Sequence, residues 1–327
     1  MKAYVLTDQG PAMREAAKVP PKQGQLLVKV AANGLNRVDL AMATGALHGA
    51  RGGVGTVLGS EWSGVVEAVG PEVAGYAEGD RVMGASPSAF AEYVCVHAAH
   101  VLPIPPSPEG ANMNFEDAVC FPVALRTMHD AIVTEGRLAP GETVLIQGAS
   151  SGVGLLGLQI AREMGARAVI GSSTDPDRRA RLADYGADLA IDSADPGWVE
   201  KVLEFTGGKG VDLIVDQVSG NLVNANMRAT KILGRIVNVG RLGGTRSEFN
   251  ADLHALRRIT YVGVTFRTRT LDEIAAINRR SREDLWGALT AGRLTMPIDS
   301  VYPFAEVEQA LGKMARNQHF GKIVLRH

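Results

Sequence analysis

The stretch Glu142-Thr-Val-Leu-Ile-Gln-Gly-Ala-Ser-Ser-Gly-Val-Gly154 decides how the middle of this chain folds. A short apolar run stops at a turn of small residues, and the chain then continues as an amphipathic segment that Gly165 closes. The apolar residues of that segment recur at helical spacing, and they are Val153, Leu156, Ile160, Ala161 and Met164. The pattern predicts a buried strand, a tight turn and the start of a helix.

The turn between this strand and this helix consists of residues small enough to admit a phosphate group. A helix N-terminus offers unbonded amides and the positive end of its dipole, and a diphosphate can approach a backbone that lacks large side chains. The strict G-x-G-x-x-G pattern is not met, because Ala149 and Ser151 occupy its first two glycine positions. The motif alone therefore also allows a plain glycine-rich connection. Our prediction is a dinucleotide-binding loop formed by Gly148, Ala149, Ser150, Ser151, Gly152, Val153 and Gly154.

Further short apolar runs follow the loop and are separated mostly by helical segments. They lie at 168–171, 211–216, 234–240 and 259–264. Such an alternation predicts an α/β fold with a doubly wound parallel sheet, whose ligands bind at the carboxyl ends of the strands. Residues 148–154 lie at such an end.

The composition limits the possible functions. The 327 residues exceed one typical domain, and 46% hydrophobic residues can bury a sizeable core. A net charge of −1 provides no long-range attraction for nucleic acid or an anionic membrane. The sequence contains no apolar stretch of membrane-spanning length, and its start is too polar for a signal sequence, so we expect a cytoplasmic protein. Cys95 and Cys120 are too few for a four-cysteine zinc site, and we expect both to stay reduced and packed among apolar groups.

The sequence before the central stretch has a different character. Short β-like runs at 25–30, 64–69 and 91–96 are separated by turns that contain Gly and Pro, which predicts an irregular β-rich domain. A Pro-rich stretch at 101–108 ends this part, and we expect a helix near Phe115.

The end of the chain is expected to rejoin the first domain. Past Val264 the alternation fades, and the segment 300–304, a helix near 306–315 and a strand at 322–325 form a tail. We predict that this tail packs back onto the β-rich part. The predicted domains are therefore a β-rich domain at 1–124 and 268–327 and a nucleotide-binding domain at 125–267.

Several separate motifs resemble those of the medium-chain dehydrogenase/reductase superfamily, and within it the zinc-independent NADPH:quinone oxidoreductases. They are the Asn-containing loop at 34–39, the G-x-E-x-x-G turn at 58–65, the G-D-x-V hairpin at 79–82, the A-x-x-G-x-G phosphate loop at 148–154, and the segments 263–269 and 321–325. The resemblance implies a GroES-like domain interrupted by a Rossmann domain. It also implies a homodimer joined through the nucleotide-binding sheets, with 259–265 as the edge strand.

The positions that hold zinc ligands in zinc-containing alcohol dehydrogenases of this superfamily are occupied here by Asn36 and Ser60. Neither an amide nor a hydroxyl competes with thiolate, imidazole or carboxylate for zinc, so we expect no bound metal. His97 and His100 lack a Cys or carboxylate partner nearby, and we expect them to cap or line a loop. We expect Glu61 to make a structural hydrogen bond or ion pair rather than to act in catalysis.

The end of the second Rossmann strand indicates the cofactor. NAD enzymes usually place a carboxylate there, which would repel the extra phosphate of NADPH. Here Ser172 and Ser173 can donate to a 2′-phosphate, and Arg178 can neutralise its charge. We therefore predict NADPH as the cofactor.

Two observations near this strand end leave NADH possible. The nearest acid, Asp175, precedes Pro176, and this pair is typical of an N-cap followed by the first helical residue, so capping competes with ribose binding. The Tyr that many NADPH-binding relatives carry at the exit of the next strand is missing from 191–193.

The resemblance also implies roles for single residues. Asn36 would hydrogen-bond near the nicotinamide ribose or the substrate oxygen, and Thr127 would touch the nicotinamide. Arg267 and Lys322 would reach cofactor phosphate or ribose, although both are equally consistent with solvated surface charges. The remaining implied cofactor contacts are Val218 and the backbone of Val239, Gly240 and Phe266, where the last three would hold the carboxamide.

The implied reaction is hydride transfer from NADPH to a quinone or a related α,β-unsaturated carbonyl. The family Tyr that often lines the substrate pocket is replaced, since that stretch offers only Leu47 and His48. A quinone tolerates this loss, because hydroquinone oxygens take protons from solvent, whereas an enolate would need a donor that the sequence does not identify. The alternatives are an enoyl or 2-alkenal reductase on the same scaffold and a non-catalytic NADPH-binding protein.

Overall fold

The computed structural model describes residues 1–47, 52–106, 110 and 113–327. The chain divides into two compact units. The β-rich unit comprises Met1–Val123, Phe266–Gly292 and Met296–His327, and the parallel-sheet unit comprises Ala124–Thr265 and Arg293–Thr295. The chain thus builds most of the first unit, continues into the second and returns to complete the first.

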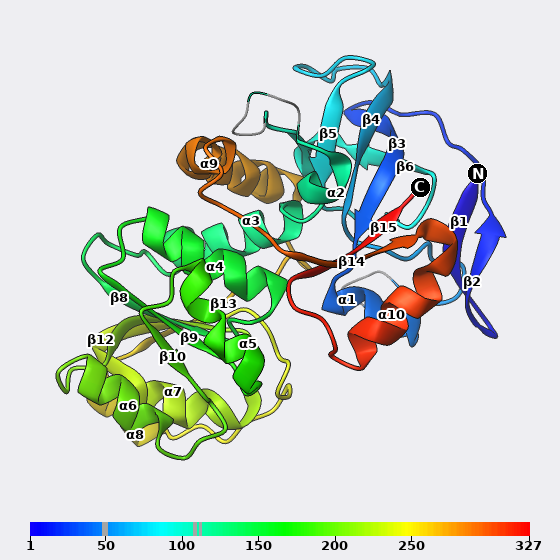
Figure 1. Ribbon diagram of the computed structural model, residues 1–327. Coiled ribbons are helices and arrows are strands. Elements are labelled where there is room, and N and C mark those ends of the chain that lie inside the picture. Colours follow the sequence, from blue (N-terminus) through cyan, green and yellow to red (C-terminus); the bar gives the residue numbers. More distant parts are fainter. Residues whose placement is uncertain (48–51, 107–109, 111–112) are drawn as a thin grey trace. The chain divides into compact units, whose positions relative to one another are not determined.

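Six parallel strands form the sheet of the parallel-sheet unit (Figure 1). The chain enters the sheet at β8, runs outward through β9 to β10, and then crosses to β11 on the other side of β8. Sheets of this kind bind ligands where the strand order reverses, here between β8 and β11. The predicted doubly wound parallel sheet is confirmed. In spatial order the strands are β10 (Leu189–Ile191), β9 (Ala168–Ser172), β8 (Thr143–Gln147), β11 (Val211–Asp216), β12 (Thr230–Asn238) and β13 (Thr260–Gly263).

Helices connect these strands and cover the sheet. Leu145, Ile170, Ile214 and Ile236 of the four central strands are fully buried and form part of the core beneath the helices. The helical segments are α3 (Pro122–His129), the π-helix η2 (Asp130–Thr134), α4 (Gly152–Glu163), α5 (Pro176–Ala180), η3 (Leu182–Tyr185), α6 (Trp198–Phe205), η4 (Gly220–Leu222), α7 (Val223–Ala229) and α8 (Ala251–Arg257).

The β-rich unit is built on a seven-stranded sheet and a separate hairpin of β1 (Lys2–Thr7) and β2 (Gly10–Glu15). Its short helical segments are α1 (Arg37–Ala43), η1 (Ala98–His100) and α2 (Phe115–Ala118). The strands of the main sheet are β3 (Gln25–Gly34), β4 (Trp62–Val69), β5 (Arg81–Gly84), β6 (Tyr93–His97), β7 (Val101–Pro103), β14 (Ile298–Pro303) and β15 (Lys322–Arg326).

The end of the chain completes the β-rich sheet. Strand β15 pairs antiparallel with β3, with Val324 opposite Gly34, so the prediction that the tail packs onto the first domain is confirmed. The same part contains η5 (Phe304–Glu306), α10 (Val307–Ala315) and a long helix, α9 (Leu271–Thr290), that the sequence pattern did not predict. Neither α9 nor any other helix in the described part of the chain is both long and apolar enough to cross a membrane.

Candidate functional site

The glycine-rich loop connects β8 to α4 at the point where the strand order reverses. Gly148 adopts a left-handed backbone conformation with φ of 71°, which favours glycine. Ser151 is the N-cap of α4, and its hydroxyl accepts a hydrogen bond from the amide of Gly154 at 3.0 Å. The other first amides of α4 have no acceptor within the helix, so they can bind an anion.

Close packing inside the loop explains why its last residue is a glycine. A Cβ atom on Gly154 would lie 2.6 Å from the carbonyl oxygen of Gly148 and 2.7 Å from the Cα atom of Ala149. The start of α4 therefore packs directly onto the loop backbone. This close contact is the role that the third glycine plays in dinucleotide-binding loops.

The two serines that follow β9 have different surroundings. Ser172 is fully buried, donates to the Gln147 side chain at 2.6 Å and accepts from the amide of Gly148 at 2.9 Å. Its only hydroxyl hydrogen is therefore used inside the protein, and the prediction that Ser172 donates to a 2′-phosphate is wrong. Ser173 donates to the hydroxyl of Ser150 at 2.9 Å, which links the end of β9 to the loop.

The start of α5 carries the arginine predicted to meet the 2′-phosphate. Asp175 is the N-cap and accepts from the amide of Arg178 at 3.0 Å, with Pro176 in the first turn, so the predicted capping role is confirmed. The Arg178 guanidinium has its Nε atom 3.6 Å from the Asp175 carboxylate. It therefore lies at the end of β9, close to the predicted position.

A second arginine at the same strand end was not predicted. Arg179 donates to the carbonyl oxygen of Ser173 at 2.8 Å and lies 3.1 Å from the carboxylate of Asp192, which follows β10. The sequence did contain a signal for this contact. Asp192 directly follows one strand, and Arg179 lies one turn into the helix that follows the neighbouring strand. This spacing has meaning only once β9 and β10 are known to be adjacent.

The turn after β11 is held by a buried carboxylate. Asp216 accepts from the amides of Val218 at 2.8 Å and Ser219 at 2.9 Å, and burial raises its pKa. Ser219 has a left-handed φ of 59°, unusual for a residue other than glycine. Sequence reasoning predicted Val218 as a cofactor contact but missed the acid that places it.

The backbone amides that follow β12 are already hydrogen-bonded within the protein. The amides of Val239 and Gly240 both donate to the carbonyl oxygen of Asp216, at 2.8 and 3.1 Å. The carbonyl oxygen of Gly240 accepts from the Ser219 hydroxyl at 2.9 Å. Neither amide is therefore left to donate to a ligand, and a contact of a carboxamide with the carbonyl oxygens of this backbone stays a prediction.

Three further residues that the sequence predicted as cofactor contacts lie outside the segments described so far. Thr127 is half-buried on α3. Phe266 is half-buried and Arg267 is exposed, just after β13. Their contacts with a cofactor stay predictions.

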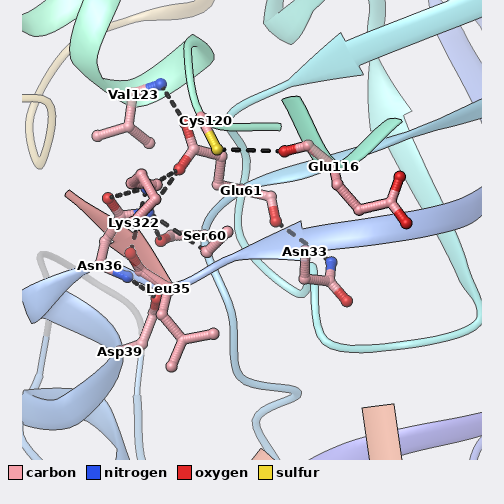
Figure 2. Close-up of polar contacts among 11 residues, drawn as sticks. Asn33, Leu35, Asn36, Asp39, Ser60, Glu61, Glu116, Cys120, Val123 and Lys322 are labelled. Atoms are coloured by element: carbon pink, nitrogen blue, oxygen red, sulfur yellow. Dashed lines mark hydrogen bonds and ion pairs between the residues drawn. The ribbon is translucent and has the colours of Figure 1, made fainter. Parts of the chain in front are cut away.

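The β-rich unit contains a buried ion pair between Glu61 and Lys322 (Figure 2). The side chains are 0% and 5% exposed. Lys322 begins β15 and donates to Glu61, to Asn36 at 3.0 Å and to the carbonyl oxygen of Leu35 at 3.1 Å. All three ammonium hydrogens are used, so Lys322 is neither a solvated surface charge nor free to bind a cofactor phosphate, and both predictions for this residue are wrong.

Glu61 joins three segments of the β-rich unit. One carboxylate oxygen accepts from the amide of Val123 at 2.6 Å, and the other receives Lys322 and the Asn36 amide. The predicted structural role of Glu61 as an ion-pair partner is confirmed. A buried carboxylate needs such donors, because leaving it unpaired in the interior costs several kcal/mol.

The Asn36 side chain is fully engaged inside this cluster. Its amide nitrogen donates to Ser60 at 3.1 Å and to Glu61 at 3.0 Å, while its oxygen accepts from Lys322 at 3.0 Å. The nitrogen of Asn36 is therefore occupied, and a hydrogen bond from a ribose or a substrate to its oxygen stays a prediction. Ser60, which accepts from Asn36, is half-buried.

Asp39 lies behind Asn36 on α1 and is fully buried. Its Oδ2 atom accepts from the Asn36 backbone amide at 2.7 Å, while its Oδ1 atom has no hydrogen-bond partner among the described residues. Burial raises the pKa of this carboxyl. Contacts with the Asn36 amide, the Ser60 hydroxyl and Lys322 lower the pKa again in part, and the result is about 7. The cluster thus contains a carboxyl whose pKa lies close to neutral pH.

The residues at this place do not suit a zinc ion. The neighbouring donors are an amide and a hydroxyl, and Glu61 is already paired with an ammonium group. Within the ranges that the structure describes, no three His, Cys, Asp or Glu side chains lie together as a metal site requires.

His97 and His100 make contacts that stabilise loops, and the two cysteines differ in burial. His97 caps η1 by accepting from the Ala99 amide at 3.2 Å, and a ring nitrogen of His100 lies 3.0 Å from the carbonyl oxygen of Ala85, as expected for residues that cap or line a loop. Cys120 is buried, and burial raises the pKa of its thiol, whereas Cys95 is only partly buried. Leu47 is 69% exposed, and His48 lies outside the described residues.

Comparison with known families gives two matches. Residues 22–106 match the alcohol dehydrogenase GroES-like domain, and residues 152–280 match the zinc-binding dehydrogenase family. These matches agree with the predicted pairing of a GroES-like with a Rossmann domain. They fall on the β-rich part and mainly on the parallel-sheet part, respectively.

Individual relatives are similar over almost the whole chain. The phthioceranic/hydroxyphthioceranic acid synthase of Mycobacterium tuberculosis is 31% identical over 316 residues, 94% of this chain. The chain spans only a small fraction of the curated relatives it matches, 14% of the length in this case. A mycobacterial quinone oxidoreductase of known structure has a TM-score of 0.87 at 26% identity, and both chains are covered fully. A mycobacterial structure described as complexed with NADPH has a TM-score of 0.87 at 25% identity, again with full coverage of both chains.

Proposed function

The chain belongs to the medium-chain dehydrogenase/reductase superfamily, and from this premise we propose that it is a zinc-independent reductase that uses NADPH to reduce a quinone or a related α,β-unsaturated carbonyl. The observation that carries the proposal is the loop from Gly148 to Gly154, which offers helix amides to a diphosphate where the strand order reverses. NADPH supplies a hydride when it is bound. The residues of the chain bind and orient the reactants and exclude water.

The proposed cofactor site runs along the carboxyl ends of β8 and β9. The amides at the start of α4 that are not bonded inside the loop would hold the diphosphate, and the Ser150 and Ser173 hydroxyls lie together at the loop edge. Arg178 and Arg179 follow on α5 and would meet the 2′-phosphate. NADPH is favoured over NADH because two guanidinium groups, those of Arg178 and Arg179, lie at this strand end, and because a structural relative is described with NADPH.

Replacing Arg178 with alanine should raise the KM for NADPH at least tenfold and change the KM for NADH by less than about twofold. A charge-assisted hydrogen bond to phosphate contributes roughly 1.5–3 kcal/mol, and NADH has no phosphate at this place. Steady-state kinetics with both cofactors measures the difference. The exposed Arg246→Ala serves as a matched control. Equal effects of Arg178→Ala on both cofactors would contradict the assignment.

The absence of a catalytic zinc is part of the proposal. It is supported by Asn36 and Ser60 at the positions of zinc ligands and by the Lys322 ammonium that already neutralises Glu61. The protein would therefore position an acceptor that is already activated by conjugation. Quinones and α,β-unsaturated carbonyls are such acceptors.

An enoyl or 2-alkenal reductase on the same scaffold is the second candidate function. It is favoured because 94% of this chain is similar to a segment of the phthioceranic/hydroxyphthioceranic acid synthase. A non-catalytic NADPH-binding protein is the alternative from another class.

A panel of quinones and enones with NADPH and NADH separates these possibilities. We expect acceptor-dependent loss of NADPH absorbance with 1,4-benzoquinone, in protein that metal analysis finds free of stoichiometric zinc. Turnover of an enone but not of the quinone would favour the enoyl or 2-alkenal reductase. Cofactor binding without oxidation by any acceptor would favour the non-catalytic protein, and zinc at one ion per chain would contradict the proposal.

We also propose a homodimer joined through β13. This strand is the edge of the parallel sheet and is mostly exposed. Its Tyr261 packs edge to face against Phe249, with ring centroids 6.4 Å apart, and Leu256 on α8 is 73% exposed. A second copy of β13 would satisfy the open strand edge and cover these apolar groups.

Changing Tyr261 to lysine should convert the dimer into a monomer. The substitution places a charge on the strand that each copy presents to the other, and like charges facing each other destabilise such a pairing. Sedimentation equilibrium measures the mass directly, with the exposed Leu271→Lys on α9 as control. A monomeric unmodified protein, or a dimer that persists in Tyr261→Lys, would refute this interface.

A further inference from the structure

We propose that Gln217 is a positioning residue that fixes the spacing between two cofactor-binding segments of the parallel-sheet unit. One segment is the loop from Gly148 to Gly154 after β8, and the other is the turn after β11 that contains Val218. This role rests on the proposed function, since it concerns how the chain binds a dinucleotide. Such a ligand lies across the point where the strand order reverses, so it contacts the segments on both sides.

The side chain of Gln217 is turned into the loop that follows β8. It is 6% exposed, and its amide nitrogen donates to the carbonyl oxygens of Gln147 at 3.2 Å and Gly148 at 3.3 Å. Its side-chain oxygen accepts from the Ser151 hydroxyl at 3.2 Å. Carbonyl oxygens only accept, so the nitrogen must face them, which settles the orientation of the amide. Both amide hydrogens are used inside the protein, so Gln217 would act on a cofactor through the loop.

The backbone of Gln217 holds a third segment, the loop after β12. Its carbonyl oxygen accepts from the amide of Leu242 at 3.2 Å. A Cβ atom on Gly240 would lie 2.3 Å from this same oxygen, so the start of that loop packs directly on Gln217. On the side of β8, a Cβ atom on Gly148 would lie 3.4 Å from the Cγ2 atom of Val218. The segments that follow β8, β11 and β12 thus meet at Gln217.

A chain of fully buried side chains forms a second connection between β8 and β11. Asp216 accepts from the Asn226 side-chain nitrogen at 2.9 Å, and the Asn226 side-chain oxygen accepts from Gln147 at 2.8 Å. Gln147 accepts in turn from the Ser172 hydroxyl at 2.6 Å, and Ser172 accepts from the Gly148 amide at 2.9 Å. Among the described residues, none of these side chains has an unpaired buried polar atom. A fully paired buried network is rigid, so it provides a fixed base for the turn after β11.

The spacing between the two segments matters only to a ligand that contacts both. The strands of a parallel sheet fix each loop where it leaves the sheet, and contacts between the loops set their separation beyond that point. A ligand that bridges two loops binds tightly when they already lie at the matching distance, because binding then does not have to order them. A ligand that contacts one loop alone does not depend on this distance.

Two substitutions remove the contacts of Gln217 with the loop. Gln217→Met keeps the length of the side chain and removes its three hydrogen bonds. Gln217→Glu keeps an oxygen that can accept from Ser151 but loses both donated hydrogen bonds. Both leave the buried chain from Asp216 to Gly148 in place, so we expect folded proteins, which thermal denaturation checks. The exposed Gln309→Met on α10 is the matched control.

Calorimetric titration with NADPH, NADH and adenosine 2′,5′-bisphosphate tests this role without turnover. The bisphosphate contains only the adenosine half of NADPH, so it would contact the loop after β8 and the end of β9 but not the turn after β11. We expect both Gln217 variants to bind NADPH and NADH at least about tenfold more weakly than the unmodified protein and the bisphosphate within about twofold of it. Gln309→Met should bind all three ligands like the unmodified protein.

The remaining outcomes would overturn the inference. Equal weakening of the bisphosphate would indicate a loop that has lost its own structure, and unchanged binding of NADPH would indicate that Gln217 does not position the loops. Failure of both variants to fold would indicate a structural role alone. Weaker binding of NADPH with unchanged binding of NADH would also contradict the inference, because the two cofactors share the same diphosphate. Unmodified protein that binds neither NADPH nor NADH would refute the proposed function, and the inference with it.

Discussion

Replacing Lys322 with methionine will lower the free energy of unfolding of the β-rich unit by about 3–5 kcal/mol. The substitution keeps the length of the side chain but removes the ammonium group, so the fully buried Glu61 carboxylate loses its counter-charge. Urea denaturation followed by tryptophan fluorescence measures the loss, since Trp62 is fully buried in this unit. The large effect comes from the charge that is left behind, not from the strength of the pair itself.

A double substitution separates these two contributions. Glu61→Gln together with Lys322→Met removes both charges and keeps an amide oxygen that can accept from Val123, so it should recover much of the stability lost in Lys322→Met. Lys201→Met, which breaks an exposed ion pair with Asp195, should cost less than about 1 kcal/mol. A loss below 1 kcal/mol for Lys322→Met, or a double variant less stable than Lys322→Met, would disprove the interpretation.

Changing Gly154 to alanine should weaken NADPH binding about 100-fold, which corresponds to about 2.7 kcal/mol. The added Cβ atom would lie 2.6 Å from the Gly148 carbonyl oxygen, so the loop and the start of α4 must move apart. The loop amides would then lose the arrangement that holds a diphosphate. Titration of NADPH fluorescence with protein measures the dissociation constant.

Gly287→Ala is the control for this substitution. Gly287 lies within α9, and a Cβ atom there meets no other group within 4 Å. It should bind NADPH like the unmodified protein. If Gly154→Ala also bound NADPH with unchanged affinity, the assignment of the phosphate loop would be false.

Local sequence patterns predicted the elements that depend on short-range interactions. The strand, turn and helix around Gly148 formed as expected, and β11 occupies the predicted residues 211–216. The Asp175–Pro176 pair begins α5, because an N-cap needs only a side chain and an amide three residues away. The long helix α9 was missed because charged residues interrupt its apolar periodicity, although Thr270 and Glu273 form a capping box at its start.

The candidate site was predicted less well, because its contacts join distant parts of the chain. Ser172 has the right residue type and position for a phosphate contact, but the neighbouring strand places Gln147 within reach of its hydroxyl. Lys322 looked like a surface charge, although apolar residues follow it at 323–325, because lysine is rarely buried without a partner. No sequence signal connected it to Glu61, which lies 261 residues earlier.

The sequence by itself determined the doubly wound sheet, the β-rich part, the glycine-rich strand–turn–helix and the caps, since each depends on residue spacing within a short window. Only the tertiary structure decided which polar groups remain available to a ligand. The pairing of β15 with β3 brings Lys322 beside Asn36 and Glu61, and there the Asn36 nitrogen donates to Glu61 and Ser60 while its oxygen accepts from Lys322. A hydrogen-bonding group has a limited number of partners, and which partners it meets depends on the order of the strands in space rather than along the chain.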